Sequence, residues 1–294
     1  MKSVVRVKRR AVATFAATAM VAGGSMAVLG AAPASAATVS SGSLTYTCVT
    51  SLGVKDFGVK ASMGLPVSVA PGKTVTPKNT KMDLVIPEDL VGALKFFFKA
   101  TAVSGGSDNA TYTPKGAADP APVAIKDLKA PLTRLPDSGP LTLHAVGTAG
   151  SFTAGEAGHT VSLKMPQSFI VNAQDQSGNP LPSFPCTLAA DQKDGIGNVK
   201  IQHPATVAAK MTTNNLTSAK HAKVAVKVQT EGQAKGTIVV KEGKRLLAKG
   251  TLVNGKKTLS LKLLKKGTHK VKVMFKGNKT TRPATKTLTI KVTR

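Results

Sequence analysis

The sequence predicts an all-β protein made of two tandem antiparallel β-sandwiches, the first with one short helix, that follow a signal peptide. Two observations carry this prediction: short runs of alternating apolar and polar residues recur along most of the chain, and Gly, Pro, Ser, Asp and Asn separate them. A third is that the charge divides the chain into unlike halves. With 294 residues, 41% of them hydrophobic, the chain is long enough for two ordinary domains and apolar enough to bury a core.

The predicted domain boundaries follow from these patterns. Residues 191–221 are polar and lack a sustained period, so we expect a linker there with at most one short strand. The predicted segments are a signal peptide at 1–36, a disulfide-closed β-sandwich domain at 37–190, a linker at 191–221 and a basic Ig-like domain at 222–294.

The first 36 residues have the order of a secretory signal peptide. Five basic residues precede an uncharged apolar run over 11–32, and the small residues Ala34 and Ala36 flank Ser35 at a cleavage site. We expect cleavage after Ala36, with Ala37 as the alternative, and no transmembrane segment in the mature chain. An uncleaved membrane anchor is the other interpretation of the apolar run. The expected location is therefore secreted: extracellular or associated with the cell wall.

One segment of the first half departs from the strand pattern. Pro87 suits the first position of a helix, and the acidic residues Glu88 and Asp89 suit its positive end. We predict an amphipathic helix over 88–99 that covers an open end of the sandwich. Its run Phe96–Phe98 is predicted to belong to the core, and the alternative is an exposed binding patch. The apolar face is predicted to contain Leu90, Val91, Leu94, Phe97 and Phe98.

The two cysteines fall in the first and last predicted strands of this half. In an exported chain with an even number of cysteines, Cys48 and Cys186 are expected to form a disulfide. Closing a loop of roughly 140 residues stabilises a fold by about 5 kcal/mol in the chain-entropy model. The alternative is a pair of free thiols, one of them a nucleophile.

Four landmarks of the first half carry a resemblance. They are LTYTC, IPEDLVGALKFF, SGPLTLHAVGTAG and FPCTL, in this order over residues 38–190. This segment resembles a secreted domain of unknown function that is common in high-GC Gram-positive bacteria. The resemblance implies a β-sandwich with one paired disulfide, and it implies no catalytic residue, because the family has none assigned.

The second half alternates more regularly. Valines and lysines alternate in KVAVKVQ and HKVKVMFK, and Asn254-Gly255 is a strong signal for a two-residue hairpin turn. Six or seven strands in about 75 residues fit a small Ig-like module. Residues 221–294 also resemble the bacterial Ig-like repeat domains of secreted and surface proteins, which serve as spacers or adhesive modules. The landmarks are Gly236, Thr251–Gly255, Leu263, Gly267–His269 and Gly277-Asn278.

The charge of this half departs from that family. Of the chain's formal charge of +27, residues 37–200 contribute +2 and residues 201–294 contribute +20, with 22 basic residues against Glu231 and Glu242. Nineteen of the 22 are Lys, a hydrated point charge, so we expect loose, salt-sensitive attraction to polyanions. The alternative is that Lys only protects the edge strands from aggregation. The predicted polyanion-binding residues are Lys223, Lys227, Lys262, Lys270, Lys272, Lys276 and Lys291.

No catalytic motif is found in the sequence. The five His are scattered, and a weak calcium-like grouping of Asp191, Asp194 and Asn198 does not follow the order of an EF-hand loop. We predict no catalytic residue, no metal and no cofactor.

The predicted function is therefore that of a secreted, non-catalytic protein of the cell envelope or of adhesion. Its basic Ig-like domain would bind anionic wall polymers and present the first domain, without specific binding of nucleic acid. One alternative is a secreted enzyme with an unrecognised site in the first domain, which a pocket containing His144 or His159 beside a carboxylate would favour. The other is a general polyanion- or DNA-binding cationic protein.

Overall fold

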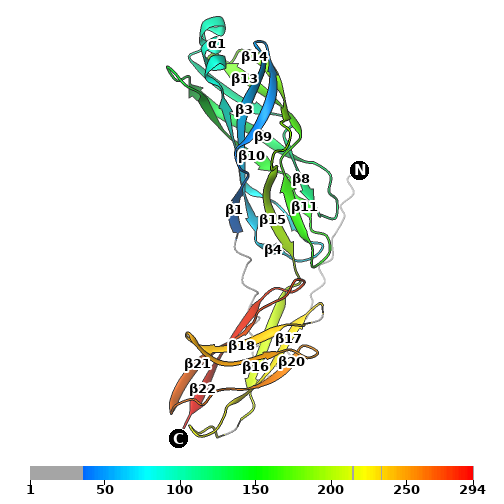
Figure 1. The fold of residues 1–294 in the computed structure, drawn as a ribbon, viewed down its shortest axis with the longest axis vertical. Coiled ribbons are helices and arrows are strands. Elements are labelled where there is room, and N and C mark those ends of the chain that lie inside the picture. The colour runs from blue at the N-terminus through cyan, green and yellow to red at the C-terminus, as the bar shows by residue number, and fades with distance from the viewer. Residues whose placement is uncertain (1–35, 214, 233, 294) are drawn as a thin grey trace, which may run out of the picture. The chain divides into compact units, whose positions relative to one another are not determined.

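The computed structural model describes residues 36–213, 215–232 and 234–293, and these form an all-β protein with one helix (Figure 1). The predicted signal peptide lies outside the described residues, apart from Ala36. We call residues 36–201 the first part and residues 205–292 the second part. The first part contains β1 (Ala36–Ser40), β2 (Leu44–Thr50), β3 (Gly53–Pro66), β4 (Ser68–Val69), β5 (Thr74–Val75), β6 (Lys78–Ile86), α1 (Glu88–Phe98), β7 (Ala102–Ser107), β8 (Thr111–Lys115), β9 (Val123–Arg134), β10 (Leu141–Ala149), β11 (Phe152–Thr153), β12 (Thr160–Lys164), β13 (Ser168–Asp175), β14 (Pro180–Leu188) and β15 (Gly195–Ile201).

Eight strands of the first part close into a ring. They pair in the order β10-β6-β3-β2-β14-β13-β7-β9, and β9 pairs again with β10, antiparallel throughout. Beyond β9 the sheet continues through β8, β12, β15 and β4, and β1 is added to β3. The prediction of a two-sheet sandwich for residues 37–190 is therefore wrong. The first part has one closed sheet, because β10 pairs with β6 on one side and with β9 on the other.

The inside of the ring is filled by alternate side chains of its strands. On β2, Leu44, Tyr46 and Cys48 are buried, while the residues between them are more exposed. The Tyr46 hydroxyl donates a 2.7 Å hydrogen bond to the carbonyl of Pro166, and its ring meets Phe169 edge-on at 4.9 Å. A buried phenol therefore has its polar group satisfied without water.

The expected disulfide is present. Cys48 and Cys186 are register partners on β2 and β14 and are bonded to each other, 138 residues apart in sequence. Both cysteines are fully buried in the core of the ring. The bond thus joins two strands that close the ring from opposite ends of the first part.

Helix α1 lies at one end of the closed sheet (Figure 1) and follows the prediction closely, since it covers 88–98 after Pro87. Polar contacts hold it: Lys95 donates to the carbonyl of Pro136, and the Glu88 carboxylate accepts a 2.8 Å hydrogen bond from the amide of Gly139. The Asp89 carboxylate pairs with Lys55 on β3, and this interaction lowers the pKa of Asp89. The residues that α1 buries are Leu90, Val91, Ala93 and Leu94.

The prediction that Phe96–Phe98 belong to the core is wrong. Phe96 is 68% exposed, Phe97 64% and Phe98 39%. Periodicity places Phe97 and Phe98 toward the apolar side of the helix, but at this end of α1 that side faces an open cavity instead of packed side chains. Phe96 and Phe97 are therefore among the most exposed large apolar side chains of the described residues, and Phe98 is exposed to a smaller degree.

The segment predicted as a linker, 191–221, contains two strands, β15 and β16. Ile196, Val199 and Ile201 of β15 are buried in the core of the first part, and Val207 of β16 belongs to the core of the second. Alternation is weak in β15 because Gly195 and Gly197 occupy two of its positions, which explains why the pattern was missed.

The second part consists of two antiparallel sheets that share one core. The sheets are β16-β17-β20 and β19-β18-β21-β22, and the inward side chains follow the predicted alternation of Val224, Val226 and Val228. The second part contains β16 (Ala205–Met211), β17 (Lys223–Thr230), β18 (Thr237–Glu242), β19 (Arg245–Thr251), β20 (Lys256–Ser260), β21 (Gly267–Phe275) and β22 (Ala284–Val292).

The predicted turn at Asn254-Gly255 is confirmed. Both residues have positive φ, 49° and 71°, and the backbones of Val253 and Lys256 exchange hydrogen bonds of 3.0 and 2.9 Å across them. The turn leads from β19 of one sheet into β20 of the other. Within the described residues, no helix combines the length and the apolar character that crossing a bilayer would need.

Candidate functional site

All seven lysines predicted to bind polyanions are exposed, but the structure distributes them over both sheets of the second part. Lys223 and Lys227 lie on β17 in the three-stranded sheet. The four-stranded sheet carries the larger group, with Lys270 and Lys272 on β21 and Lys291 on β22. The remaining two, Lys262 and Lys276, lie just after β20 and β21.

On the four-stranded sheet, two lysines lie directly opposite each other. Lys272 of β21 is the register partner of Lys241 of β18, and Lys270 stands two residues along the same face. Lys241 was missed in the sequence because TIVVKE has no alternation that would assign its lysine to a face. Like charges directly opposite on neighbouring strands destabilise a sheet.

The three-stranded sheet repeats this arrangement. Lys227 of β17 is the register partner of Lys256 of β20, and Lys210 of β16 is opposite the residue between Lys223 and Lys227. Lys256 directly follows the Asn254-Gly255 turn, so a signal for its position existed in the sequence. Each sheet of the second part thus presents one facing pair of lysines.

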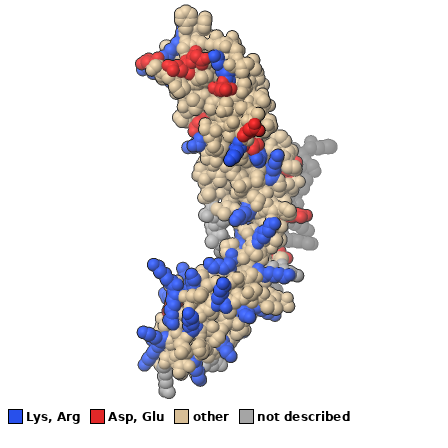
Figure 2. All heavy atoms as spheres, viewed as in Figure 1, with Lys and Arg blue, Asp and Glu red and all other residues tan. Residues whose placement is uncertain are grey.

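The two acidic residues of the second part pair with histidine and arginine side chains and do not pair with its lysines. Glu231 is 3.1 Å from His203, and Glu242 is 2.6 Å from His269 and 4.0 Å from Arg245. In the part of the chain that the structure describes, no carboxylate forms an ion pair with a lysine of β16–β22. Figure 2 accordingly shows basic side chains gathered over these strands, whereas both signs are mixed over the first part.

The carboxylate of Glu242 also acts on the protonation of His269. The carbonyl of Lys265 accepts a hydrogen bond from Nε2 over 2.8 Å, and Glu242 is bonded to Nδ1. Both contacts favour the imidazolium ion, so the pKa of His269 is raised. This histidine adds to the positive charge of the second part as the pH falls.

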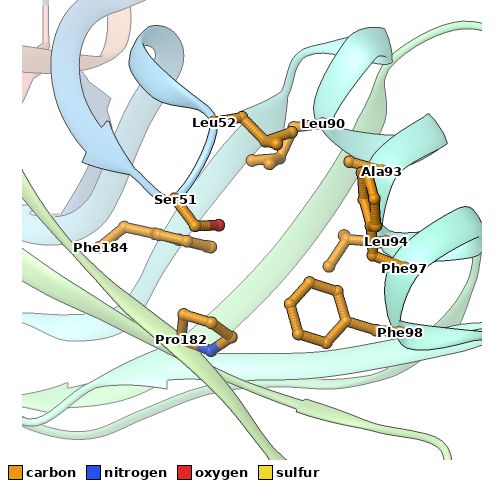
Figure 3. A pocket seen from close by; sticks show the side chains of 9 residues that line it. All are labelled: Ser51, Leu52, Leu90, Ala93, Leu94, Phe97, Phe98, Pro182 and Phe184. Carbon is orange, nitrogen blue, oxygen red and sulfur yellow. The ribbon is translucent and has the colours of Figure 1, made fainter.

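A second candidate site is an apolar pocket at the end of the closed sheet (Figure 3). Its volume is about 280 Å³, and it lies between α1, the β2–β3 turn and β14. Eight of its nine lining residues are apolar, and Ser51 supplies the only polar side chain. The lining residues are Ser51, Leu52, Leu90, Ala93, Leu94, Phe97, Phe98, Pro182 and Phe184.

The polar backbone groups of the pocket walls are largely satisfied within the protein. In the β2–β3 turn, the Thr50 hydroxyl donates to the carbonyl of Gly53 over 2.8 Å and accepts from the amide of Leu52 over 3.2 Å. Pro182 has no N–H group, and the amides on the lining side of α1 are bonded within the helix. The pocket therefore offers carbon surface and one hydroxyl group.

The groups that could support other chemistry lie apart from this pocket. His144 Nδ1 is 2.7 Å from Asp83 on the outer face of β10 and β6, where the His144 side chain is 73% exposed. Asp194 pairs with Lys164 over 2.6 Å, and Asn198 accepts a 2.8 Å hydrogen bond from Ser162. Among the described residues, no three His, Cys, Asp or Glu side chains are grouped so that they could hold a metal.

The fold and these sites define an all-β protein with a disulfide-bonded closed sheet and a lysine-rich pair of sheets. The chain belongs to DUF6801, a family of unknown function, whose model matches residues 45–197. The match overlaps most of residues 38–190, where the sequence predicted a domain of unknown function, and extends seven residues into the segment predicted as a linker. No curated protein has a sequence that matches this chain.

Several solved structures show a distant likeness. The fibronectin(III)-like modules of CbhA from Clostridium thermocellum are 10% identical, with a TM-score of 0.28, over 78% of this chain and 91% of that one. A β-D-glucuronidase from Dictyoglomus thermophilum is 11% identical, with a TM-score of 0.23 over 87% of this chain. The BSP domain of a biofilm-associated protein is 12% identical, with a TM-score of 0.25 over 89% of this chain. This chain spans 44% and 52% of the last two, and at these scores the likeness carries no argument about function.

Proposed function

We propose that the protein is an exported, non-catalytic protein of the cell envelope or of adhesion, whose second part binds anionic wall polymers by charge. One observation carries the proposal: the facing lysine pairs, Lys241 with Lys272 and Lys227 with Lys256, form no ion pair with any carboxylate of the described residues. The first part, which belongs to the family of unknown function, would be presented at the polymer surface.

The energetics of the lysine pairs support this function. A like-charge pair directly opposite on neighbouring strands costs about 0.2–1 kcal/mol, and the +20 charge of residues 201–294 adds further self-repulsion. A bound polyanion converts this repulsion into attraction. Residues that destabilise a fold, such as these facing lysines, are expected mainly at functional sites, where the loss of stability is tolerated for the sake of function.

The kind of ligand follows from the chemistry of lysine. Ammonium groups are strongly hydrated and do not form the planar, paired hydrogen bonds of arginine, so they suit flexible polymers of phosphate or carboxylate. The two-sheet second part is compatible with a small Ig-like sandwich of the bacterial type. Export through the predicted signal peptide would place such a module among wall polymers.

The full chain tests the proposal. In the test variant, Lys223, Lys227, Lys270 and Lys272 are changed to Gln. In the matched control, the exposed residues Lys60, Lys73, Lys81 and Lys126 of the first part are changed to Gln, which removes the same charge. Binding to immobilised poly(glycerol phosphate) is measured across a salt series.

We expect the test variant to bind more weakly and to lower the slope of log K against log salt by about 3, the value for four lost phosphate contacts. The control variant should bind within twofold of the wild type. Equal losses in both variants would mean that only net charge matters. If duplex DNA competes as well as the polymer per phosphate, the protein is a general polyanion binder instead.

A further inference from the structure

The apolar pocket beneath α1 is not used by the function proposed above. Its rim exposes Phe97 and Phe98, and the pocket opens to solvent beside them. We propose that this pocket binds the hydrocarbon chain of a free single-chain amphiphile, such as a fatty acid. The proposal is independent of polymer binding by the second part.

The size of the pocket fits one chain. A volume of about 280 Å³ lies just below the range of about 300–1,000 Å³ that is usual for small-molecule sites. A slender chain can occupy such a space, whereas a lipid with two long chains requires more. The flat ring of Phe98 and the buried side chains of Leu90 and Leu94 supply contacts along the length of a chain (Figure 3).

The chemistry of the walls favours a hydrocarbon chain over a peptide. A peptide segment carries an N–H and a C=O group at nearly every residue, and each needs a hydrogen-bond partner when it is buried. The walls offer little beyond the Ser51 hydroxyl, because the turn at Thr50 and the helix satisfy their own backbone groups. A hydrocarbon chain has no such requirement.

The surroundings of the pocket also disfavour a bilayer as the occupant. The segments around the pocket carry the basic residues Lys55, Lys95 and Lys99 and the acidic residues Asp56, Glu88, Asp89 and Asp137, so they have no excess of positive charge. Lys55 is paired with the Asp89 carboxylate, and Lys95 donates to the backbone carbonyls of Pro136 and Asp137. The Lys99 ammonium lies 5.2 Å from the centre of the Phe96 ring. Without an excess of positive charge, this surface lacks the electrostatic attraction that holds peripheral proteins on anionic lipids.

The test is calorimetric titration of the full chain with saturated fatty acids of increasing length, each below its micelle concentration. We expect the affinity to rise about fourfold for each added methylene group until the chain fills the pocket, and then to level off. An Ala93→Leu variant, which adds carbon atoms inside the pocket, should level off at a shorter chain. Circular dichroism shows whether each variant is folded.

Adjacent phenylalanines provide the matched control. Phe96 and Phe97 are similarly exposed, at 68% and 64%, but of these two only Phe97 lines the pocket. Phe97→Ser should weaken decanoate binding at least about tenfold, which is the loss of roughly two methylene contacts, while Phe96→Ser should leave it within twofold. Equal losses in both variants would overturn the proposal in favour of a nonspecific apolar surface. Binding to phosphatidylglycerol vesicles or to a leucine-rich peptide without binding of decanoate would overturn it as well.

Discussion

Cys48 and Cys186 are register partners on β2 and β14, and their disulfide links two neighbouring strands of the ring that lie 138 residues apart in sequence. The bond therefore couples the first long strand of the family segment to the last strand of the ring. It constrains the unfolded chain over a loop of 138 residues, which is long enough for a large entropic effect.

Replacing both cysteines with Ala should lower the free energy of unfolding of the first part by about 2–5 kcal/mol. The measurement is urea denaturation of the wild type and the double variant, followed by circular dichroism. The reduced wild type should resemble the variant. An unchanged midpoint would mean that the pairing of the strands alone holds the ring closed.

Alkaline pH should reveal the burial of both tyrosines. Burial raises the pKa of Tyr46 and of Tyr112, and their hydroxyls donate to the carbonyls of Pro166 and Gly150. Because the folded pKa is raised, the folded state holds its phenol protons more tightly than the unfolded state. Stability should be unaffected below a pH of about 10 and should fall as the pH rises beyond it.

The ultraviolet absorbance of phenolate checks this prediction, since the chain has two Tyr and no Trp. We expect no ionisation step near pH 10 in the folded protein and one cooperative rise when the protein unfolds. A normal titration of one phenol near pH 10 would show that its burial is incomplete.

Relief of charge repulsion should stabilise the second part. Lys272→Thr removes one member of the pair with Lys241 and should raise the free energy of unfolding by about 0.2–1 kcal/mol at low salt. The gain should disappear at high salt because the charges are screened. Lys266→Thr, at an exposed position outside the strands, is the control and should have no such effect.

If Lys272→Thr is more stable and also binds poly(glycerol phosphate) less well, the lysine pair costs stability in favour of function. If the stability of Lys272→Thr equals that of the wild type at every salt concentration, the ammonium groups of Lys241 and Lys272 do not repel each other measurably. The proposal of polymer binding then loses its main support.

His269 should titrate above its usual pKa of about 6.5. The Lys265 carbonyl and the Glu242 carboxylate raise its pKa, so its contribution to stability is fully present below the unfolded value. That contribution is lost as the pH rises through the folded pKa. Nuclear magnetic resonance titration of the imidazole gives the pKa directly.

Glu242→Gln should move the pKa of His269 back toward its usual value without restoring it, because the Lys265 carbonyl, the larger influence, stays in place. A His269 signal that titrates at or below the usual value would contradict the contacts described here.

The sequence predicted local structure better than long-range arrangement. The alternation of β17, the Asn254-Gly255 turn and the limits of α1 depend on neighbouring residues, and the structure matches them. The closed ring depends on β10 pairing with both β6 and β9, and no local pattern encodes a second partner. The strand β15 was hidden because Gly195 and Gly197 weaken its alternation.

The same limit applies to the two candidate sites. The alternating pattern correctly predicted that Lys223, Lys227 and Lys272 are exposed. The register that places Lys272 opposite Lys241 comes from the pairing of β18 with β21, which are far apart in sequence. Periodicity gave Phe97 the correct side of α1, yet it could not tell that a cavity lies there. Sequence patterns thus identified which residues point outward or inward, and only the fold showed what they meet.

Closure of a sheet also affects self-association. Every strand within the ring of the first part is paired on both sides, and the free edges of that sheet lie outside the ring at β1 and β4, whereas the sheets of the second part end at β16, β20, β19 and β22. Exposed edges can template further strands into fibres, and lysines such as Lys210, Lys249 and Lys256 oppose this by keeping copies apart. A polymer that neutralises these lysines would remove that protection where it concentrates the protein. When the polymer is saturated with protein, the bound molecules should therefore pair through their exposed strand edges and form a cross-linked layer.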